Sequence, residues 1–212
     1  MWQQWYEQHA QPDFLAVAAD TQGPEAARPW VERARAGFAV AVDTANELGA
    51  LLGYSVVPTG IFVDETGAVR HLQPGDFSVR DASTRRRADR FLAGERDVLE
   101  ELTVETNVRR DSLERELIDA KLRLASELLA SGRPEDALTE LDGALELDPD
   151  NFVIRKQRWS IRHPERFQPE IDWDWQKQQL AREREAERMT RDAACGPSGC
   201  PIAAAPPPDG NT

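Results

Sequence analysis

The chain of 212 residues is 40% hydrophobic and 30% charged, which allows one well-packed core and a second small unit but not three domains. Its formal net charge of -12 disfavours nucleic acid and anionic membranes as partners, because their phosphates would be repelled. No apolar run reaches the length of a membrane span, and the N-terminus lacks the basic and apolar segments of a signal peptide. As written, the chain is predicted to be cytoplasmic, whereas an extracytoplasmic location stays open if the natural start lies upstream.

The first elements alternate between strand and helix. Residues 14–19, "FLAVAA", form an apolar run that is typical of a buried strand, and residues 38–42, "FAVAV", form a second one. A helix is predicted between them, beginning near Pro24 and ending at Gly37, and residues 44–53 carry leucines at helical spacing. This strand–helix–strand–helix order predicts that the two strands pair in parallel.

The next stretch, "GYSVVPTGIFVDETGAV", changes the pattern. Residues 61–63 are β-like, "DETG" is turn chemistry, and "AVRHL" is a second strand at hairpin distance, so an antiparallel hairpin is predicted. Together with the two parallel strands, this hairpin predicts one mixed sheet. From Asp81 the pattern turns helical, and Phe91 and Leu92 are predicted to pack back on the sheet.

The second half is predicted to be helical almost throughout. Residues 95–132 have a helical pattern that breaks near Thr106 and Asn107. An amphipathic helix follows and ends at Asp148-Pro149, and two further helices are predicted over 152–161 and about 173–193. The Ala- and Pro-rich end beyond Pro201 is predicted to be disordered.

Part of this half resembles a single tetratricopeptide repeat. Four residues stand at the offsets of the second helix of that repeat: Ala137, Leu141, Ala144 and Pro149. The first helix matches more loosely, because Lys121 stands where the family often has an aromatic residue and Ala125 replaces the usual glycine. A capping helix with Trp159 follows, and an ordinary helical hairpin is the alternative. Either hairpin has to bury its apolar face on a neighbour.

The first half resembles the thioredoxin-like superfamily, in its thiol-disulfide reductase and redoxin branch. The resemblance runs from about Trp2 to Phe91 and depends on the order of elements and on "VVPTGIFVDETGAV". In that family the proline matching Pro58 is cis and faces the redox cysteines, and the adjacent backbone pairs with a peptide or a substrate thiol. The resemblance therefore implies Val57, Pro58 and Thr59 as substrate-binding residues. The alternative is a trans proline that enters an edge strand.

The chain departs from that family at its N-terminal end. A complete member has a strand and a Cys-x-x-Cys turn ahead of the helix whose last turns "WQQWYEQH" resembles, and this chain has neither. Three explanations stay open: a start placed too far downstream, loss of the redox pair in a binding module, or thiols supplied by the C-terminal tail. Omission of an inner strand also predicts a chain that is marginally stable, dimeric or completed by another polypeptide.

The only cysteines are Cys195 and Cys200, in "CGPSGC" near the C-terminus. The glycines and the proline between them allow a small disulfide ring. Redox or thiol exchange, capture of a metal or metalloid, and an inert tail are all open, although two thiolates alone leave a zinc or copper site incomplete. His9, His71 and His163 are isolated in the sequence and are interpreted as structural.

The sequence thus predicts four segments: an N-terminally incomplete α/β thioredoxin-like domain over 1–100, a tetratricopeptide-like helical unit over 108–162, an aromatic connector with a charged helix over 163–193, and a tail over 194–212. The predicted function is thiol-disulfide chemistry or thiol-dependent handling of a protein partner, with Cys195 and Cys200 as the catalytic dithiol and no cofactor or metal. The alternative is a non-enzymatic adaptor whose repeat groove binds a peptide. The predicted partners are protein or peptide thiols, with a homodimer or a completing chain as further options.

Overall fold

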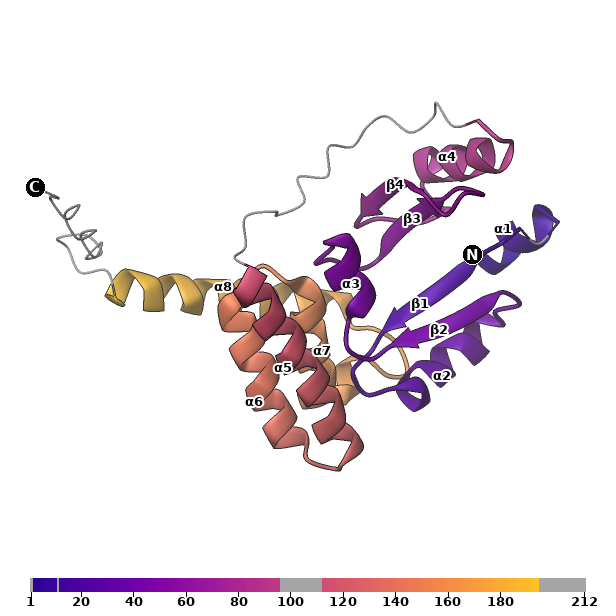
Figure 1. Ribbon diagram of the computed structural model, residues 1–212. Coiled ribbons are helices and arrows are strands. Elements are labelled where there is room, and N and C mark those ends of the chain that lie inside the picture. Colours follow the sequence, from indigo (N-terminus) through magenta and orange to yellow (C-terminus); the bar gives the residue numbers. More distant parts are fainter. Residues whose placement is uncertain (1, 11, 96–111, 195–212) are drawn as a thin grey trace, which may run out of the picture. The chain divides into compact units, whose positions relative to one another are not determined.

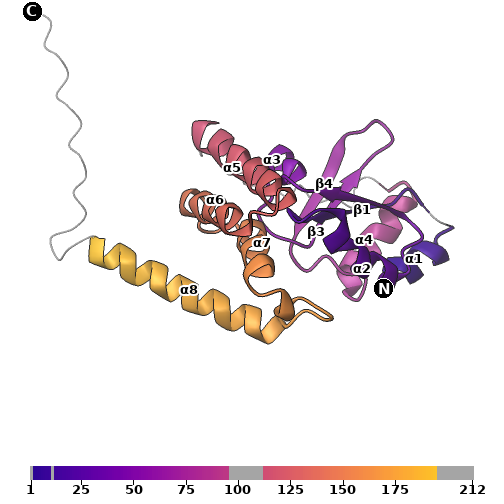
Figure 2. The same cartoon turned by 90° about the horizontal axis from the view of Figure 1, so that it is seen from below.

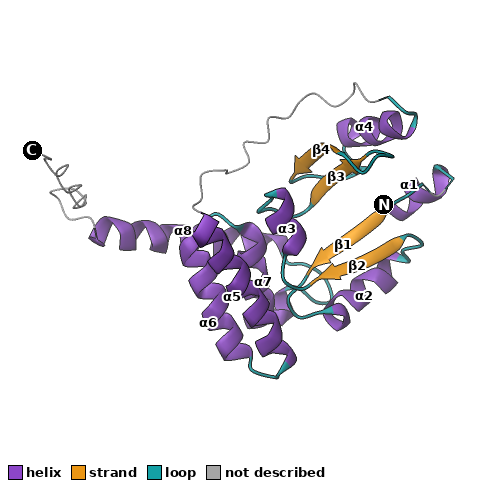
Figure 3. Ribbon diagram, viewed as in Figure 1, coloured by secondary structure: helices purple, strands orange, loops and turns teal. Residues whose placement is uncertain are grey.

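The computed structural model describes residues 2–10, 12–95 and 112–194, and it divides into two compact units, Met1–Arg162 and His163–Thr212 (Figure 1). The first unit holds strands and helices, whereas the described part of the second is helical with short connections (Figure 3). The predicted break near Thr106 and Asn107 and the predicted disordered tail lie outside the described residues.

The two apolar runs near the N-terminus form strands β1 (Leu15–Ala19) and β2 (Ala39–Asp43). They pair in parallel, from Leu15 opposite Ala39 to Ala19 opposite Asp43, which confirms the predicted pairing. Helix α2 (Pro24–Ala34) connects them and begins with a proline in its first turn, where the missing N–H costs nothing. The helix ends before Gly37, because Arg35 takes a left-handed conformation with φ of 49° and caps it.

Strands β3 (Thr59–Val63) and β4 (Val69–Pro74) form the predicted antiparallel hairpin. The turn is held by the Asp64 carboxylate, whose Oδ1 accepts hydrogen bonds from the N–H groups of Thr66 and Ala68, both at 2.9 Å. A hydrogen bond from the Thr66 hydroxyl, together with these two from the backbone, stabilises the ionised form and lowers the pKa of Asp64. The "DETG" sequence therefore forms a hairpin because its first side chain replaces the backbone acceptors that the turn lacks.

The predicted single mixed sheet is wrong. The structure has two separate two-stranded sheets, β1–β2 and β3–β4, and no strand pairing joins them within the described residues. Side chains join the two sheets instead. Helix α1 (Trp2–Gln8) supplies Trp2, which stacks on Phe77 after β4 at 4.8 Å between ring centroids and contacts Phe14 before β1 at 5.3 Å. Side-chain packing of this kind fixes no register between strands. It therefore leaves a strand edge without backbone hydrogen bonds to a neighbouring strand.

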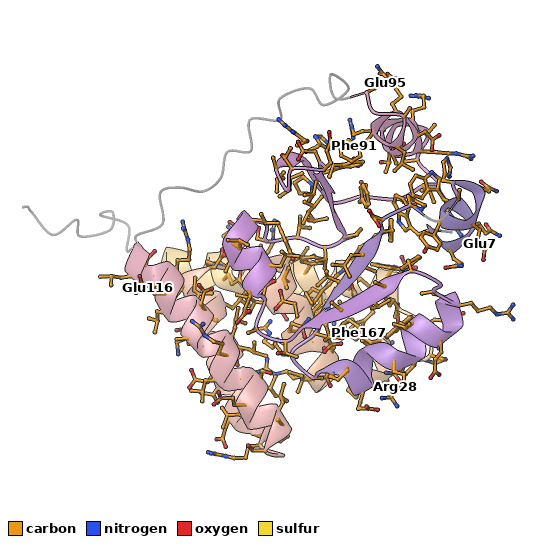
Figure 4. All side chains as sticks on the ribbon, turned by 45° about the vertical axis from the view of Figure 1, so that its right-hand side comes forward. Glu7, Arg28, Phe91, Glu95, Glu116 and Phe167 are labelled. Carbon is orange, nitrogen blue, oxygen red and sulfur yellow. The ribbon has the colours of Figure 1, made fainter. Side chains whose placement is uncertain are left out.

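Helix α4 (Ala82–Leu92) follows the hairpin and packs on it, as predicted for Phe91. Figure 4 labels Phe91 on α4. Its ring meets that of Phe62 of β3 edge-on, at 5.2 Å between ring centroids. Asp89 of the same helix accepts a hydrogen bond of 2.8 Å from the indole N–H of Trp5 in α1. Leu92 differs from its prediction, because it is 41% exposed.

Three helices make the second part of the first unit: α5 (Ser112–Ala130), α6 (Pro134–Leu147) and α7 (Phe152–Arg162). Helices α5 and α6 lie side by side in both Figure 1 and Figure 2. Their contact is lined by residues with no exposed surface: Ala125, Ala137, Leu141 and Ala144. Alanines at the contact let the two helices approach closely, as the repeat pattern predicts.

The looser match of the first repeat helix has a local explanation. Lys121 stretches across Gly143 of α6, where an added Cβ would lie 2.9 Å from its Nζ, and pairs with Glu140 at 2.9 Å. The lysine stem thus covers the neighbouring helix as an aromatic ring would, while the ammonium group reaches a carboxylate.

The second unit contains a short 3-10 turn, Pro164–Arg166, and the helix α8 (Trp173–Ala194), whose bounds agree with the predicted charged helix. Asp172 caps α8 by accepting a hydrogen bond of 2.9 Å from the Trp175 N–H, and Arg166 pairs with Asp172 at 3.0 Å. The Trp175 ring also contacts His163 and Phe167. Through these contacts the predicted aromatic connector packs against the first turn of α8.

Candidate functional site

The residues that the sequence singles out for substrate binding precede or begin β3. The peptide bond between Val57 and Pro58 is cis, and Pro58 is exposed. Thr59 is held by its own loop, because its hydroxyl donates a hydrogen bond of 2.6 Å to the carbonyl oxygen of Val56. Val57 is half-buried and packs against a cluster that includes Tyr54. The pKa of Tyr54 is raised to about 12, because burial and the charge of Asp43 disfavour the phenolate.

The helical part covers one side of this loop. At the start of α7 the N–H groups of Phe152 and Val153 donate hydrogen bonds to the carbonyl oxygen of Ser55, at 2.8 Å and 3.2 Å. Val153 joins the cluster of Tyr54 that also holds Val57. The loop before β3 therefore serves as a docking point for α7, which the sequence alone does not indicate.

A single glutamine makes the second attachment. Gln157 of α7 donates from Nε2 to the carbonyl oxygen of Ala19, and its Oε1 accepts from both the N–H and the hydroxyl of Thr21, each at 3.0 Å. Gln157 and Thr21 are both buried, so these bonds form away from water. The end of β1 is thereby attached to the helical part through side-chain and backbone hydrogen bonds.

The predicted catalytic dithiol, Cys195 and Cys200, lies outside the described residues, so its relation to Pro58 stays a prediction. Within the described ranges no group of three or more metal-ligating side chains gathers. His9 pairs with Asp89 at 3.1 Å, and His163 lies 3.5 Å from Glu165.

His71 on β4 is buried, and neither of its ring nitrogens has a hydrogen-bond partner among the described residues. Burial lowers its pKa, and the positive charge of Arg87 lowers it further. The ring packs 5.5 Å from that of Phe62. His71 is therefore held as a neutral core residue, and this agrees with its structural interpretation.

The helix α5 has an apolar side that the sequence reasoning missed. Its inward side holds Ile118, Leu122, Ala125 and Leu128, all buried. On its outward side Leu113, Leu117 and Leu124 are 68%, 47% and 42% exposed, and Ala120 between them is exposed as well. We call Leu113, Leu117, Ala120 and Leu124 the α5 stripe. Leucines on two sides of one helix are the sequence signal that would have indicated it, because a helix on a surface needs only one apolar side.

Charged side chains border the α5 stripe. Glu116 and Arg123 are exposed along one side of it, and Arg123 lines a hollow together with Glu47 and Ala50 of α3 (Glu47–Leu52). Glu114 and Lys121 lie along the other, and Lys121 is half-buried by its pairing with Glu140. An apolar strip between two charged borders is the usual anatomy of a surface that contacts another protein.

Comparison with known families identifies one segment. Residues 118–160, which run from α5 to α7, match the family described as Tetratricopeptide repeat. No curated protein and no solved structure matches the chain. The prediction of a repeat in the helical part is thus confirmed, whereas the thioredoxin-like prediction has no support from a family match. None of the described helices is both long and apolar enough to cross a bilayer.

Proposed function

We propose that this protein is a protein-binding adaptor that uses its helical repeat part to contact a partner. The α5 stripe carries this proposal: three leucines of α5, the helix in which the repeat match begins at residue 118, stay exposed although the same helix already has a buried side. Tetratricopeptide repeats generally act by binding other proteins, and one repeat can bury its outer apolar side only on a neighbour. The proposal corresponds to the adaptor alternative of the sequence analysis.

The attachment of α7 gives the adaptor a fixed geometry within the first unit. Gln157 and the N-terminal end of α7 hold the repeat on the end of β1 and on the loop before β3. A partner bound on α5 would therefore be held in a defined orientation relative to the sheets. This is the role that a rigid scaffold has in an adaptor.

Site-specific photo-crosslinking in cells that produce the protein tests this function. A photoreactive phenylalanine analogue replaces Leu117 in the α5 stripe, and in a matched control it replaces Leu92, which is 41% exposed on α4. We expect defined protein adducts at position 117 that are absent at position 92, and loss of these adducts when Leu124→Glu is added. Equal adduct patterns at both positions would contradict the proposal.

A second candidate, thiol-disulfide handling, is favoured by the order of elements in the first half. A parallel pair of strands followed by a hairpin is the order of elements that the redoxin resemblance implies, although the two pairs do not form the single sheet predicted with it. Only Cys195 and Cys200 can supply thiols. Turnover with a dithiol reductant and a disulfide-bonded protein substrate, lost in the Cys195→Ser/Cys200→Ser variant, would support this candidate. Retention of the turnover in that variant would rule out the dithiol as its source.

A further inference from the structure

We propose that the α5 stripe binds a second copy of this chain, with the two α5 helices packed antiparallel about a two-fold axis. The inference rests on the proposed function, because it names the partner of the same surface. It starts from the spacing of the stripe. Leu113, Leu117, Ala120 and Leu124 are separated by steps of four, three and four, which is the a/d spacing of a helix-to-helix seam.

The stripe is complementary to itself. In the antiparallel arrangement Leu113 lies opposite Leu124 of the second copy, and Leu117 lies opposite its Ala120. A large side chain faces a small one in the central layers, which is how two helix surfaces interdigitate. The symmetry repeats each contact once, as the isologous interface of a two-fold dimer requires.

The charges that border the stripe select the antiparallel direction. On one border Glu116 faces Arg123 of the second copy, and on the other Glu114 faces its Lys121, so two-fold symmetry brings four opposite-charge pairs together. In a parallel pair Glu116 would face Lys121, but Arg123 would face the uncharged, buried Leu128. The helix dipoles also attract each other only when the helices are antiparallel.

The size of the stripe indicates a weak dimer. From position 113 to position 124 a helix rises about 17 Å, so the seam buries less than the roughly 800 Å² per partner of a standard stable interface. The leucines of the α5 stripe can therefore be exposed in the single chain and still form a dimer at high concentration. The predicted dimer dissociates on dilution, with a dissociation constant in the micromolar range.

Sedimentation velocity of the full chain tests this inference over concentrations from about 1 μM to about 500 μM, a range that brackets a micromolar constant. A Cys195→Ser/Cys200→Ser background excludes disulfide-linked species. We expect a reversible monomer–dimer equilibrium in this background. A monomer over the whole range would overturn the inference.

Single substitutions locate the interface. Leu117→Glu places a charge in the seam and should weaken the dimer at least about 30-fold, the cost of losing a central interface residue. Leu92→Glu, at a similarly exposed leucine on α4, should leave the dimer unchanged. Circular dichroism confirms that each variant is folded. Equal weakening by both variants, or by neither, would overturn the inference.

A charge-reversal rescue tests the direction. Glu116→Arg should weaken the dimer about 10-fold, because it faces Arg123 of the second copy. Glu116→Arg combined with Arg123→Glu restores the opposite-charge pair in an antiparallel dimer only, since in a parallel dimer the arginine introduced at position 116 would still oppose Lys121. Restoration of the affinity to within about three-fold supports the inference, and no restoration overturns it.

The outcomes separate this inference from the function on which it rests. A monomeric chain that still gives adducts with other proteins at position 117 would refute the dimer and keep the adaptor. A monomeric chain with no adducts at position 117 would refute both. Dimerisation with adducts to a second copy of the chain would support both.

Discussion

The helical part (112–162) and the sheet part (2–95) of the first unit hold together in different ways. Helices α5, α6 and α7 follow one another in the chain and share one core, in which Ala125, Leu141 and Ile154 have no exposed surface. The two small sheets share no ladder and are joined by half-buried rings such as Trp2 and Phe77. Neighbouring helices close a core with local contacts, whereas the sheets need partners that are distant in sequence.

Gln157 connects these two parts of the first unit. The sheet part obtains a fixed connection from a residue of the helical part that bonds to the end of β1. The sheet part should therefore be the first to lose structure when conditions become unfavourable, and the helical part the last.

The largest expected effect is in the helical core. Leu141→Ala should lower the free energy of unfolding by about 2–5 kcal/mol, because it leaves a cavity in a fully closed core. The same truncation at Leu72 of β4 should cost less, since many of the residues around Leu72 are only partly buried and the site can relax. Urea unfolding followed by circular dichroism measures both. An equal or larger cost at Leu72 would contradict the contrast between the two parts.

The next effect is at the attachment of α7. Gln157→Ala removes the partners of the Ala19 carbonyl and of the Thr21 N–H, and should lower stability by about 1–3 kcal/mol. Hydrogen exchange should show the loss of protection at the end of β1 and not in α6. Gln22→Ala is the matched control, because Gln22 makes an exposed hydrogen bond of 3.1 Å to Ser160 of the same helix. Similar losses in both variants would show that the buried position is not what matters.

A smaller effect, confined to acid pH, is expected from His71 in the sheet part. Its folded-state pKa is lowered by burial, so the unfolded chain binds a proton more readily as the pH falls through the ordinary value of 6.5. The contribution of His71 to stability is therefore fully present above that pH and is lost below it. His71→Leu should flatten the fall in stability between neutral and mildly acid pH, measured by urea unfolding at several pH values. An unchanged slope would show that the fall has another source.

The smallest effect is expected for the pair Lys121–Glu140, which joins α5 and α6 near the surface. A double-mutant cycle with Lys121→Met and Glu140→Gln should give a coupling of about 0.2–1 kcal/mol, because solvent screens a partly exposed ion pair. The Lys121→Met variant keeps the aliphatic cover over Gly143. A coupling well above this range would show that the ion pair, and not the small-residue packing, holds the two helices.

Much of the fold could be predicted from the sequence because its signals are local. The Pro24 helix start, the Asp64 turn and the alanine spacing of α6 each act within a few residues, and each has the predicted consequence. The single mixed sheet could not be predicted correctly, since pairing between the two strand pairs depends on residues far apart in the chain, and the structure joins the two sheets by side-chain packing instead.

The candidate site was the part least accessible to sequence reasoning. Val57, Pro58 and Thr59 were singled out for substrate binding, and the structure places α7 against that loop through Ser55. The α5 stripe was missed because the helical pattern over 95–132 does not say which of its leucines face the core. Which leucines of one helix face inward depends on where the neighbouring helices lie, and periodicity alone cannot say that when two sides are apolar.

The amino-acid sequence by itself therefore determined the helices, the parallel pair, the hairpin and the repeat, because each depends on residues close together in the chain. Only the tertiary structure decided that Gln157 reaches Thr21, 136 positions away, and that Leu113, Leu117 and Leu124 stay exposed. Contacts over such separations depend on the placement of whole elements, which no local pattern encodes.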